Sequence, residues 1–409
     1  MNLNFEFFIS SVTLGQVLFC CFLFGMRLAN RPTYFPLLLF FAANLVLVSG
    51  PILLSLSPQY YIWYIAAIFP AWLTLAPTLW LYVKGLTAAH PWAMTYKDVL
   101  HLGPVLFGII LAVAILFLPT ETQSAIFFDD QDVDSGLPLL VVMGMFFSMI
   151  FWIGQSSFYV YRITKRLIEY RKILKDLFAS NEKREMIWLS WLLIVICISW
   201  ALSATNLILT LSAGQTLFSA TSGALLMLIL LWTMGYCGLR QKPGFDGRYL
   251  RDEPDNELRV KEAAEANGGN KTKPESAPTA GQKYQRSVLG KAQSERIVEK
   301  LTIAMSEQHL YLDSDLTLHK LARRLMVSPN YLSQTINETL ESNFFDFINE
   351  WRIRHALPDV LTGEQPIIAI ATDCGFNARS SFYKMFKKVT GMTPTQFRNQ
   401  PQQFHKDVR

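Results

Sequence analysis

Long apolar stretches alternate with short polar ones over the first 240 residues of this 409-residue chain, and the pattern stops there. A helix that crosses a membrane needs about 20 mostly apolar residues. Seven stretches meet this requirement, at residues 5–28, 35–57, 61–84, 99–119, 137–161, 187–211 and 216–238. The pattern therefore predicts a seven-helix transmembrane bundle at residues 1–240.

The periodicity changes after Arg240. Residues 241–283 show no regular apolar pattern and are rich in Ala, Gly, Pro, Glu, Lys, Ser and Thr, a composition typical of a flexible linker. Apolar residues then return at helical spacing on short segments with polar faces. The sequence predicts a flexible cytoplasmic linker at 241–283 and a small all-helical domain at 284–400, so the whole chain is expected to be all-α.

Two helix-turn-helix patterns fill the C-terminal domain. In the first, a short helix with an apolar stripe leads into the turn "MVSPN", where Ser328 is the expected N-cap and Pro329 the first helical residue. In the second, Gly375 and Phe376 form the expected turn, and Asn377 is expected to cap the next helix. The segment "FFDFINEWRIRHALPDVL" predicts a connecting helix between the two units.

The distribution of positive charge predicts the orientation in the membrane, because cytoplasmic loops carry an excess of Lys and Arg. With the N-terminus outside, the outer segments contain no Lys or Arg. The loop after the fifth span carries the largest set, Arg162, Lys165, Arg166, Arg171, Lys172, Lys175, Lys183 and Arg184. Seven spans then place the C-terminus inside. We expect a multi-pass protein of the bacterial inner (cytoplasmic) membrane, in contact with lipid, with its C-terminal domain in the cytoplasm.

This third inner loop begins with an amphipathic pattern at residues 162–178. Its apolar residues recur at heptad a/d spacing, with basic residues between them: Ile163, Leu167, Tyr170, Leu174 and Leu177. The pattern predicts a helix that continues out of the fifth span. Two arrangements fit it: the helix lies on the anionic inner leaflet, or it packs against a second copy in a homodimer.

The chain shows little sign of catalytic chemistry. No Asp, Glu, Lys or Arg lies in the middle of a predicted span, which argues against ion-coupled transport. No kinase, nuclease or hydrolase motif occurs, so we expect a non-enzyme. The five cysteines include no Cys-x-x-Cys spacing, and neither a metal site nor a cofactor is expected. These observations favour a receptor or an anchor.

Several residues within the predicted spans are candidates for a pocket. Prolines kink spanning helices, and kinks fit either a cavity for an unknown small-molecule ligand or ordinary packing. These prolines are Pro51, Pro70, Pro77 and Pro104. Polar and aromatic side chains leave the same alternatives, as pocket groups or as contacts between helices. They are Asn44, Trp72, Trp200 and Asn206.

The C-terminal segment resembles a known family. The stretches "LTLHKLARRLMVSPNYLSQTINE", "NFFDFINEWRIRHA" and "IAIATDCGFNARSSFYKMFKKVTGMTPTQFR" are similar to the AraC-type (AraC/XylS) transcription regulators over about residues 290–398. The whole chain also resembles membrane-anchored members of that family, which place several spans before the same domain. The resemblance implies two helix-turn-helix units whose recognition helices enter successive major grooves of double-stranded promoter DNA.

The resemblance also implies which side chains meet DNA. The expected base-reading residues on the two recognition helices are Asn330, Ser333, Gln334, Arg379, Ser380 and Lys384. The expected phosphate contacts are Lys387, Lys388, Thr393 and Arg398. Pro358 departs from the family pattern, and a proline at this position predicts that the connecting helix ends or bends near Ala356.

These patterns together predict a membrane-bound one-component transcription regulator. The transmembrane bundle would sense a signal or localise the protein, and the C-terminal domain would bind promoter DNA sequence-specifically. An alternative is a seven-span receptor or transporter-like protein whose helix-turn-helix tail docks a protein partner. The long linker also permits release of the tail by proteolysis.

Overall fold

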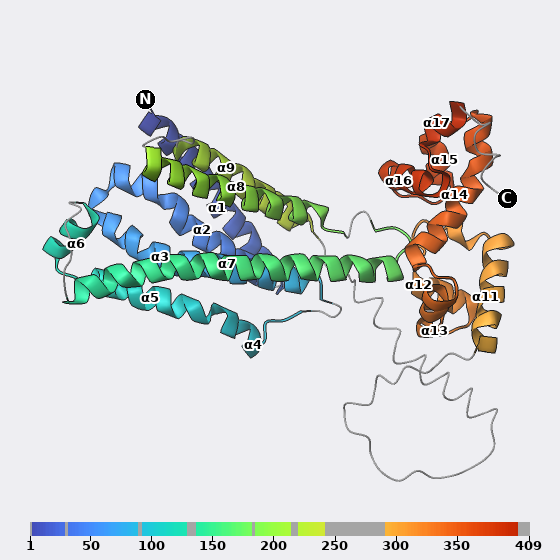
Figure 1. Cartoon of the computed structure of the whole chain (residues 1–409), viewed down its shortest axis with the longest axis horizontal. Helices are drawn as coiled ribbons and strands as arrows, with labels where there is room; N and C mark the ends of the chain where they lie inside the picture. The colour runs from blue at the N-terminus through green and yellow to red at the C-terminus, as the bar shows by residue number, and fades with distance from the viewer. Residues whose placement is uncertain are drawn as a thin grey trace, which may run out of the picture. The chain divides into compact units, whose positions relative to one another are not determined.

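The computed structural model describes residues 2–28, 32–88, 92–128, 136–181, 185–213, 220–241 and 291–399 (Figure 1). Every regular element in these ranges is helical, and the β pairing found there is an isolated antiparallel bridge between Phe178 and Thr317. The predicted all-α class is confirmed for this part of the chain. The predicted linker at 241–283, apart from Gln241, lies outside the described residues.

The chain divides into two compact units. The first consists of Met1–Ile168 and Met186–Gly247, and the second of Glu169–Glu185 and Arg248–Arg409. The C-terminal domain thus shares its unit with a segment of the third inner loop, which lies far from it in the sequence. Helix α7 (Gly136–Leu177) contributes residues to both units.

Long apolar helices build the first unit. They are α1 (Asn2–Leu28), α2 (Tyr34–Leu56), α3 (Tyr61–Leu86), α5 (Gly103–Leu116), α7, α8 (Ile187–Ala213) and α9 (Ala220–Arg240). Shorter elements lie between some of them: η1 (Pro58–Tyr60), α4 (Tyr96–Val99), η2 (Leu100–Leu102) and α6 (Thr120–Phe127). α1 packs on α2, α2 on α3, and α3 on α5, and α1 also packs on α9, which brings the two ends of this unit together.

Six stretches among the described residues are long and apolar enough to cross a membrane. They are Phe5–Leu28, Tyr34–Leu56, Pro58–Leu86, Tyr96–Leu116, Gly136–Leu177 and Thr221–Arg240. A shorter apolar stretch, Ile187–Ser199, belongs to α8, which covers the predicted span at 187–211. Six of the predicted spans therefore coincide with helices of sufficient length, and the count of seven stays a prediction.

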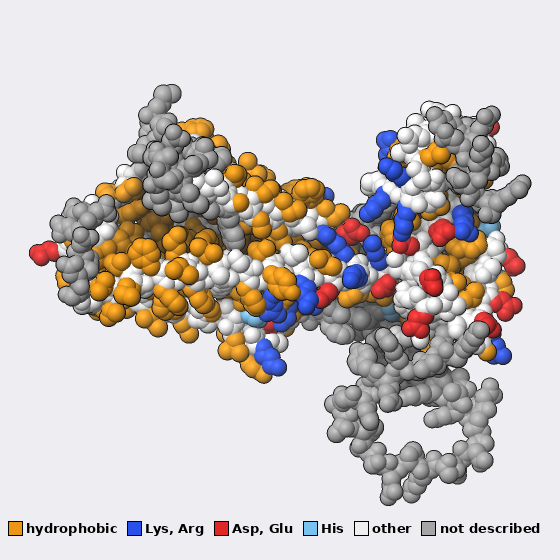
Figure 2. Space-filling view, viewed as in Figure 1, with side chains coloured by type: hydrophobic (Ala, Val, Ile, Leu, Met, Phe, Trp, Pro, Cys, Tyr) orange, Lys and Arg blue, Asp and Glu red, His pale blue; other side chains and the backbone are white. Residues whose placement is uncertain are grey.

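Large apolar side chains cover the outside of the first unit, as Figure 2 shows in orange. Phe22, Leu140 and Phe117 are 62%, 66% and 80% exposed. An apolar surface this extensive is unfavourable in water and is characteristic of proteins that face another apolar phase. The surface therefore agrees with a bundle surrounded by lipid.

Close packing between α3 and α5 depends on Gly108. A Cβ atom at this position would lie 2.8 Å from the Cα atom of Pro70, so any other residue would push the two helix backbones apart. Pro70 and Pro77 lie inside α3, and Pro51 lies inside α2. Pro104 instead lies in the first turn of α5, where a missing N–H leaves no helical bond unmade.

The prediction that a helix continues out of the fifth span is confirmed, because α7 extends without a break to Leu177. Ile163 and Leu167, two of its heptad-spaced residues, are buried in the first unit. They are therefore not available to a second copy of the chain. The homodimer through 162–178 and the helix on the inner leaflet both stay predictions.

Shorter helices build the second unit. They are α11 (Lys291–Ser306), η3 (Leu310–Leu312), α12 (Leu318–Leu325), α13 (Pro329–Gln334), η4 (Thr335–Thr339), α14 (Phe344–Thr362), α15 (Ile367–Asp373), α16 (Arg379–Thr390) and α17 (Pro394–Asn399). Two apolar cores form within the domain, one for each helix-turn-helix unit. The long helix α14 supplies both of them, with Phe344 and Ile348 in the first core and Ile353, Ala356 and Val360 in the second.

The sequence predicted that the connecting helix ends or bends near Ala356. The predicted end is wrong, and a bend at this position stays a prediction. Pro358 lies inside α14, which continues to Thr362 and ends at Gly363 in the left-handed conformation. Pro358 and Arg354, whose carbonyl loses its helical partner, are both on the exposed side, where water can replace the missing bond. Burial of Val360 on the opposite side holds the last turn of the helix in place.

Candidate functional sites

The first helix-turn-helix unit has well-formed ends. Thr317 caps α12, since its Oγ1 accepts a hydrogen bond from the Lys320 backbone N–H at 3.2 Å. Met326 then adopts the left-handed conformation and turns the chain. Ser328 is the N-cap of α13 and Pro329 follows it in the first turn, as predicted, although the Ser328 side chain makes no capping bond.

The predicted base-reading residues of this unit lie on α13. Asn330 is exposed, and Ser333 and Gln334 are half-buried. Gln334 Nε2 donates to Glu338 Oε2 at 2.9 Å, and Asn337 Nδ2 donates to Ser333 Oγ at 3.4 Å. The bond to Glu338 fixes the amide of Gln334 and leaves its Oε1 to accept a bond from a base.

The turn of the second helix-turn-helix unit requires a glycine. Gly375 has φ +84°, and a Cβ atom there would lie 2.6 Å from the Leu312 carbonyl oxygen. The turn predicted at this residue is therefore confirmed. The predicted cap is wrong: Ala378 is the N-cap of α16, and Asn377 Nδ2 instead donates to the Ser314 carbonyl at 3.1 Å.

The predicted base-reading residues of the second helix-turn-helix unit share the exposed side of α16. Arg379, Ser380 and Lys384 are exposed, while the opposite side packs into the core through Phe382, Met385 and Phe386. Figure 2 shows Lys and Arg side chains gathered over this helix. The helix thus presents donors and positive charge to solvent on one side.

Tyr383 holds the guanidinium group of Arg379. Arg379 Nη2 donates to the Tyr383 hydroxyl at 3.1 Å, and its guanidinium carbon lies 4.9 Å from the ring centroid. Burial acts to raise the pKa of Tyr383, but hydrogen bonds with Arg379 and Thr395 and the charges of Arg379 and Arg398 outweigh it and lower the pKa below its ordinary value. The contact holds the Arg379 guanidinium beside the Tyr383 ring at the start of α16.

Two of the predicted phosphate contacts lie at the end of α16. Lys387 and Lys388 are both exposed in its last turn. Lys388 Nζ forms an ion pair with Asp346 Oδ2 at 2.8 Å, in the first turn of α14. A phosphate would share Lys388 with this carboxylate, so Lys387 is the stronger candidate of the two.

The other two predicted phosphate contacts have bonding roles within the domain. Thr393 Oγ1 donates to Gln396 Oε1 at 2.9 Å, and its backbone N–H donates to the same oxygen at 3.0 Å. Arg398 donates from Nε to the Val360 carbonyl at 3.2 Å and from Nη2 to the Gln365 carbonyl at 2.9 Å. The bonds of Thr393 stay within the start of α17, whereas those of Arg398 tie α17 to the end of α14 and the segment after it. A phosphate contact by either residue stays a prediction.

A buried arginine joins the two helix-turn-helix units. Arg352 of α14 is fully buried, and it donates from Nε to the Tyr311 carbonyl and from Nη2 to the Asp313 carbonyl, each at 2.7 Å. Its Nη1 donates to Asn349 Oδ1 at 3.1 Å, and the Phe376 ring lies 5.6 Å from its guanidinium carbon. Arg352 therefore links the segment before α12 to the turn before α16. Sequence reasoning did not identify it.

Cys374 is a buried thiol beside this junction. Burial raises its pKa to about 12, and the nearby carboxylates of Asp359 and Asp373 add to the effect. The thiol therefore stays protonated at neutral pH, and a protonated, buried thiol is a poor nucleophile and a poor metal ligand. Cys374 acts as a small apolar side chain of the second core.

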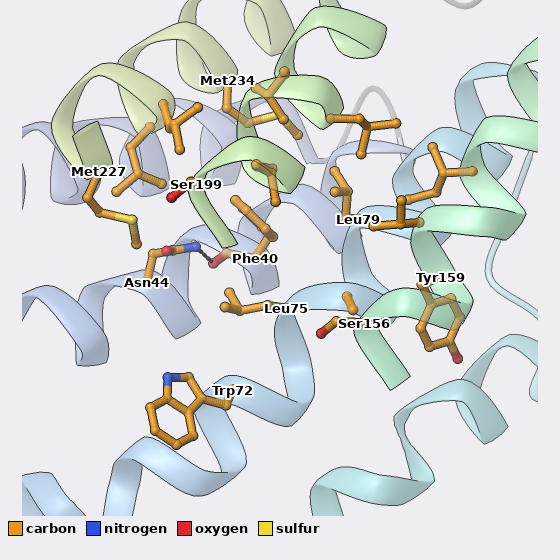
Figure 3. Close-up of a pocket in the computed structure, with 18 of the residues that line it drawn as sticks. Phe40, Asn44, Trp72, Leu75, Leu79, Ser156, Tyr159, Ser199, Met227 and Met234 are labelled. Atoms are coloured by element: carbon orange, nitrogen blue, oxygen red, sulfur yellow. Dashed lines mark hydrogen bonds between the residues drawn. The ribbon is translucent and has the colours of Figure 1, made fainter. Parts of the chain in front are cut away.

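The bundle of long apolar helices, which is the first compact unit of the chain, contains a cavity of about 310 Å³ between α2, α3, α7, α8 and α9 (Figure 3). Most of its lining is apolar, and its polar groups include the side chains of Asn44, Ser156, Tyr159 and Ser199. Asn44 Nδ2 donates to the Phe40 carbonyl at 2.8 Å, which leaves its Oδ1 as an acceptor. Of the residues proposed as pocket groups, Asn44 and Trp72 line this cavity. Asn206 is not among the lining residues, and the Trp200 side chain lies outside the described part of the structure.

Comparison with known proteins gives a family for the C-terminal domain. The family model described as a helix-turn-helix domain matches residues 321–400. An uncharacterised HTH-type transcriptional regulator of Staphylococcus aureus (strain COL) is 36% identical over 89 residues, which are 22% of this chain and 12% of that relative. The uncharacterised HTH-type transcriptional regulator YtdP of Bacillus subtilis (strain 168) is 30% identical over 92 residues, with the same coverages.

A solved structure is also similar to part of the chain. It is the C-terminal domain of AraT, a response regulator from Geobacillus stearothermophilus, with 34% identity over 28% of this chain and 88% of that one and a TM-score of 0.23. The curated alignments span about one-eighth of the relatives' lengths, because 12% of each is covered. Residues 321–400 of this chain thus match a helix-turn-helix domain, and the C-terminal part is similar to parts of HTH-type transcriptional regulators.

Proposed function

We propose that the chain is a membrane-bound one-component transcription regulator. Its C-terminal domain, in the cytoplasm, binds promoter DNA sequence-specifically, and its bundle lies in the bacterial inner membrane. The observation that carries the proposal is that one chain combines a helix-turn-helix domain similar to those of transcriptional regulators with helices, six of them among its described residues, that are long and apolar enough to span a membrane. Such a chain needs no separate messenger between sensing and DNA binding.

The geometry of the second helix-turn-helix unit supports sequence-specific binding to DNA. Arg379 and Ser380 lie in the first turn of α16, where a recognition helix meets base edges. The guanidinium of Arg379 suits the paired O6 and N7 acceptors of guanine, and the ring of Tyr383 restricts its motion before binding. Lys387 lies two turns further along, where the helix leaves the groove and a phosphate is in reach.

The cavity in the bundle supports a sensing role. Its volume of about 310 Å³ lies at the lower end of the range for small-molecule sites, about 300–1,000 Å³. No charged side chain lines it within the described part of the bundle, so a charged ligand would lose its hydration without compensation. We therefore assign it to a neutral, mainly apolar molecule that reaches it through the bilayer and bonds to Asn44 or Ser199.

A selection from random duplexes tests the DNA-binding proposal. The full-length protein, reconstituted in lipid nanodiscs, is expected to enrich duplexes with two half-sites about 34 Å apart, the distance of one helical turn. Failure to enrich any sequence would contradict it. Such a failure, together with capture of one stoichiometric protein by the same nanodiscs, would favour the alternative in which the tail docks a protein.

A further inference from the structure

Residues 178–181, here called the strap, follow α7 directly and pack into the C-terminal domain within the second unit. Phe178 and Thr317 form the antiparallel bridge, and the Ala179 backbone N–H donates to the Leu316 carbonyl at 3.2 Å. Phe178 and Ala179 are both buried, and Ala179 belongs to the first apolar core. The strap therefore extends the first helix-turn-helix unit along the segment that leads into α12.

Side chains of the domain complete the docking. Asn349 Nδ2 donates to the Ala179 carbonyl at 3.0 Å, so both backbone polar groups of Ala179 are bonded to the domain. Ser180 Oγ donates to the Ser314 carbonyl at 3.1 Å, and Arg352 Nη1 reaches Ser180 Oγ at 3.5 Å. A chance surface contact would not satisfy every polar group of a buried alanine in this way.

The strap lies where the two helix-turn-helix units meet. The Ser314 carbonyl that accepts a bond from Ser180 also accepts one from Asn377 Nδ2, at 3.1 Å in both cases. Asn377 stands two residues before α16, the second recognition helix. Arg352, which contacts Ser180, holds the carbonyls of Tyr311 and Asp313 in the same segment before α12, and its guanidinium lies against the Phe376 ring of the second helix-turn-helix unit. Displacement of the strap would therefore disturb contacts of both helix-turn-helix units at once.

The docked strap also carries an unfavourable feature. Asn181 is 1% exposed, and neither atom of its amide has a hydrogen-bond partner among the described residues. A buried amide without partners loses the bonds that it would make with water. Docking is thus opposed by Asn181 and favoured by Ala179, Ser180 and Phe178, a balance suited to a contact that forms and breaks.

The connection from the bundle to the strap is direct. α7 belongs to the first unit as far as Ile168 and ends at Leu177, one residue before the strap. The same helix lines the bundle cavity with Ser156 and Tyr159. Because an α-helix is stiff over this length, a shift of α7 reaches the strap without passing through the linker after Arg240.

We propose that the strap is the regulatory contact between bundle and DNA-binding domain. The surface formed by Ser314, Leu316, Asn349 and Arg352 takes residues 178–181 of the same chain as its partner. When docked, the strap fixes the relative position of the two recognition helices. When α7 withdraws it, the two helix-turn-helix units lose the bonds of the strap and are joined by α14 and by the remaining contacts of Arg352 and Asn377. This inference rests on the proposed sensing and DNA-binding function, but the docking itself does not.

Amide hydrogen exchange of the full chain in nanodiscs tests docking without DNA. The Ala179 amide is expected to be protected in the wild type. In Ala179→Asp, which places a carboxylate in the apolar core, protection of the strap is expected to fall. In Asn181→Leu, which removes the unpartnered amide at similar volume, protection is expected to rise. Ile173→Asp adds the same carboxylate at a half-exposed position of α7 and is expected to leave the strap protected.

Affinity for two duplexes then tests the regulatory role. Rigid linkage of two binding modules raises their combined affinity far above that of one. Ala179→Asp is therefore expected to lose about tenfold or more in affinity for a duplex with two half-sites and to keep its affinity for a duplex with one. Preserved exchange protection in α12 and α16 shows that the variant has not simply unfolded.

Two results would overturn the proposal. Rapid exchange of the Ala179 amide in the wild type would show that the strap does not dock. Equal affinities of wild type and Ala179→Asp for the two-site duplex, with strap protection lost in the variant, would show that docking does not control DNA binding. Absence of DNA binding by the wild type would instead contradict the proposed function, while the exchange measurements would still report on docking.

Discussion

Arg379 stands at the start of α16, exposed and held against the Tyr383 ring. Arg379→Ala is expected to weaken binding at the preferred site by about 1–3 kcal/mol and to relax the preference at about one base pair, because a bidentate contact to guanine is lost. Selection of random duplexes by the full-length variant in nanodiscs measures both effects. Arg296→Ala, at an exposed position of α11, is the control and should leave the preference unchanged.

Lys387 gives the contrasting case of a phosphate contact. Lys387→Ala should weaken all sequences about equally and reduce the slope of affinity against salt by about one unit, since one fewer counterion is released. If the Arg379→Ala protein selected the same sequences as the wild type, Arg379 would be a second phosphate contact rather than a base reader.

Local sequence signals predicted the roles of single residues correctly where the partner is a close neighbour in the sequence. Ser328 and Pro329 occupy the predicted positions because a cap and a first helical turn depend on neighbours within three or four residues. Asn377 failed as a cap because its amide found the Ser314 carbonyl, 63 positions away. A tertiary partner of this kind leaves no trace in the local pattern.

Arg352 shows a signal that sequence reasoning passed over. It lies four residues after Ile348 and four before Ala356, both buried, so helical periodicity places it on the buried side of α14. A buried arginine requires several acceptors. The carbonyls of Tyr311 and Asp313 supply them, and those could not be named before the fold brought them to α14.

At the scale of the element, Pro358 gives a prediction about stability. Pro358→Ala should raise the free energy of unfolding of the second unit by about 1–3 kcal/mol, because it restores an N–H donor to α14 and removes the ring clash with the preceding turn. Greater chain entropy in the unfolded state offsets part of this gain. The change in stability is measured by thermal unfolding of the full-length protein, with the amide exchange protection of α14 as the readout.

Pro329→Ala is the matched control for this prediction. Pro329 lies in the first turn of α13, where proline is favourable, so its replacement should be neutral or destabilising. A lower unfolding temperature for Pro358→Ala would indicate that the proline fits α14 without cost and that its contribution lies in restricting the unfolded chain.

The helices themselves were predictable because apolar periodicity decides them locally. α7 is the best example, since both its span and its cytoplasmic extension follow from the pattern. The strap was not predictable. Its four residues carry no motif, and its partners in the sequence lie 134 to 172 positions away. Contacts at that separation depend on the fold of the whole second unit.

At the scale of the whole molecule, two units of opposite character share one chain. The first exposes large apolar side chains, which suit lipid, and the second exposes Lys and Arg over α16, which suit phosphate (Figure 2). This division follows from composition alone, whereas the assignment of residues 169–185 to the second unit does not. Composition assigns a segment to an environment, but it does not assign a loop to the domain on which it packs.

The orientation in the membrane decides whether the second unit can meet DNA at all. Lys and Arg are absent from the predicted outer segments and abundant in the inner ones, so the end of α9 at Arg240 and the C-terminus at Arg409 should both lie in the cytoplasm. A reporter enzyme active only in the cytoplasm should therefore work when fused after either residue and fail when inserted in the loop at 120–136. The control is a reporter active only in the periplasm, which should show the reverse pattern. Periplasmic activity of the fusion after Arg409 would separate the domain from chromosomal DNA and would contradict both the topology and the proposed function.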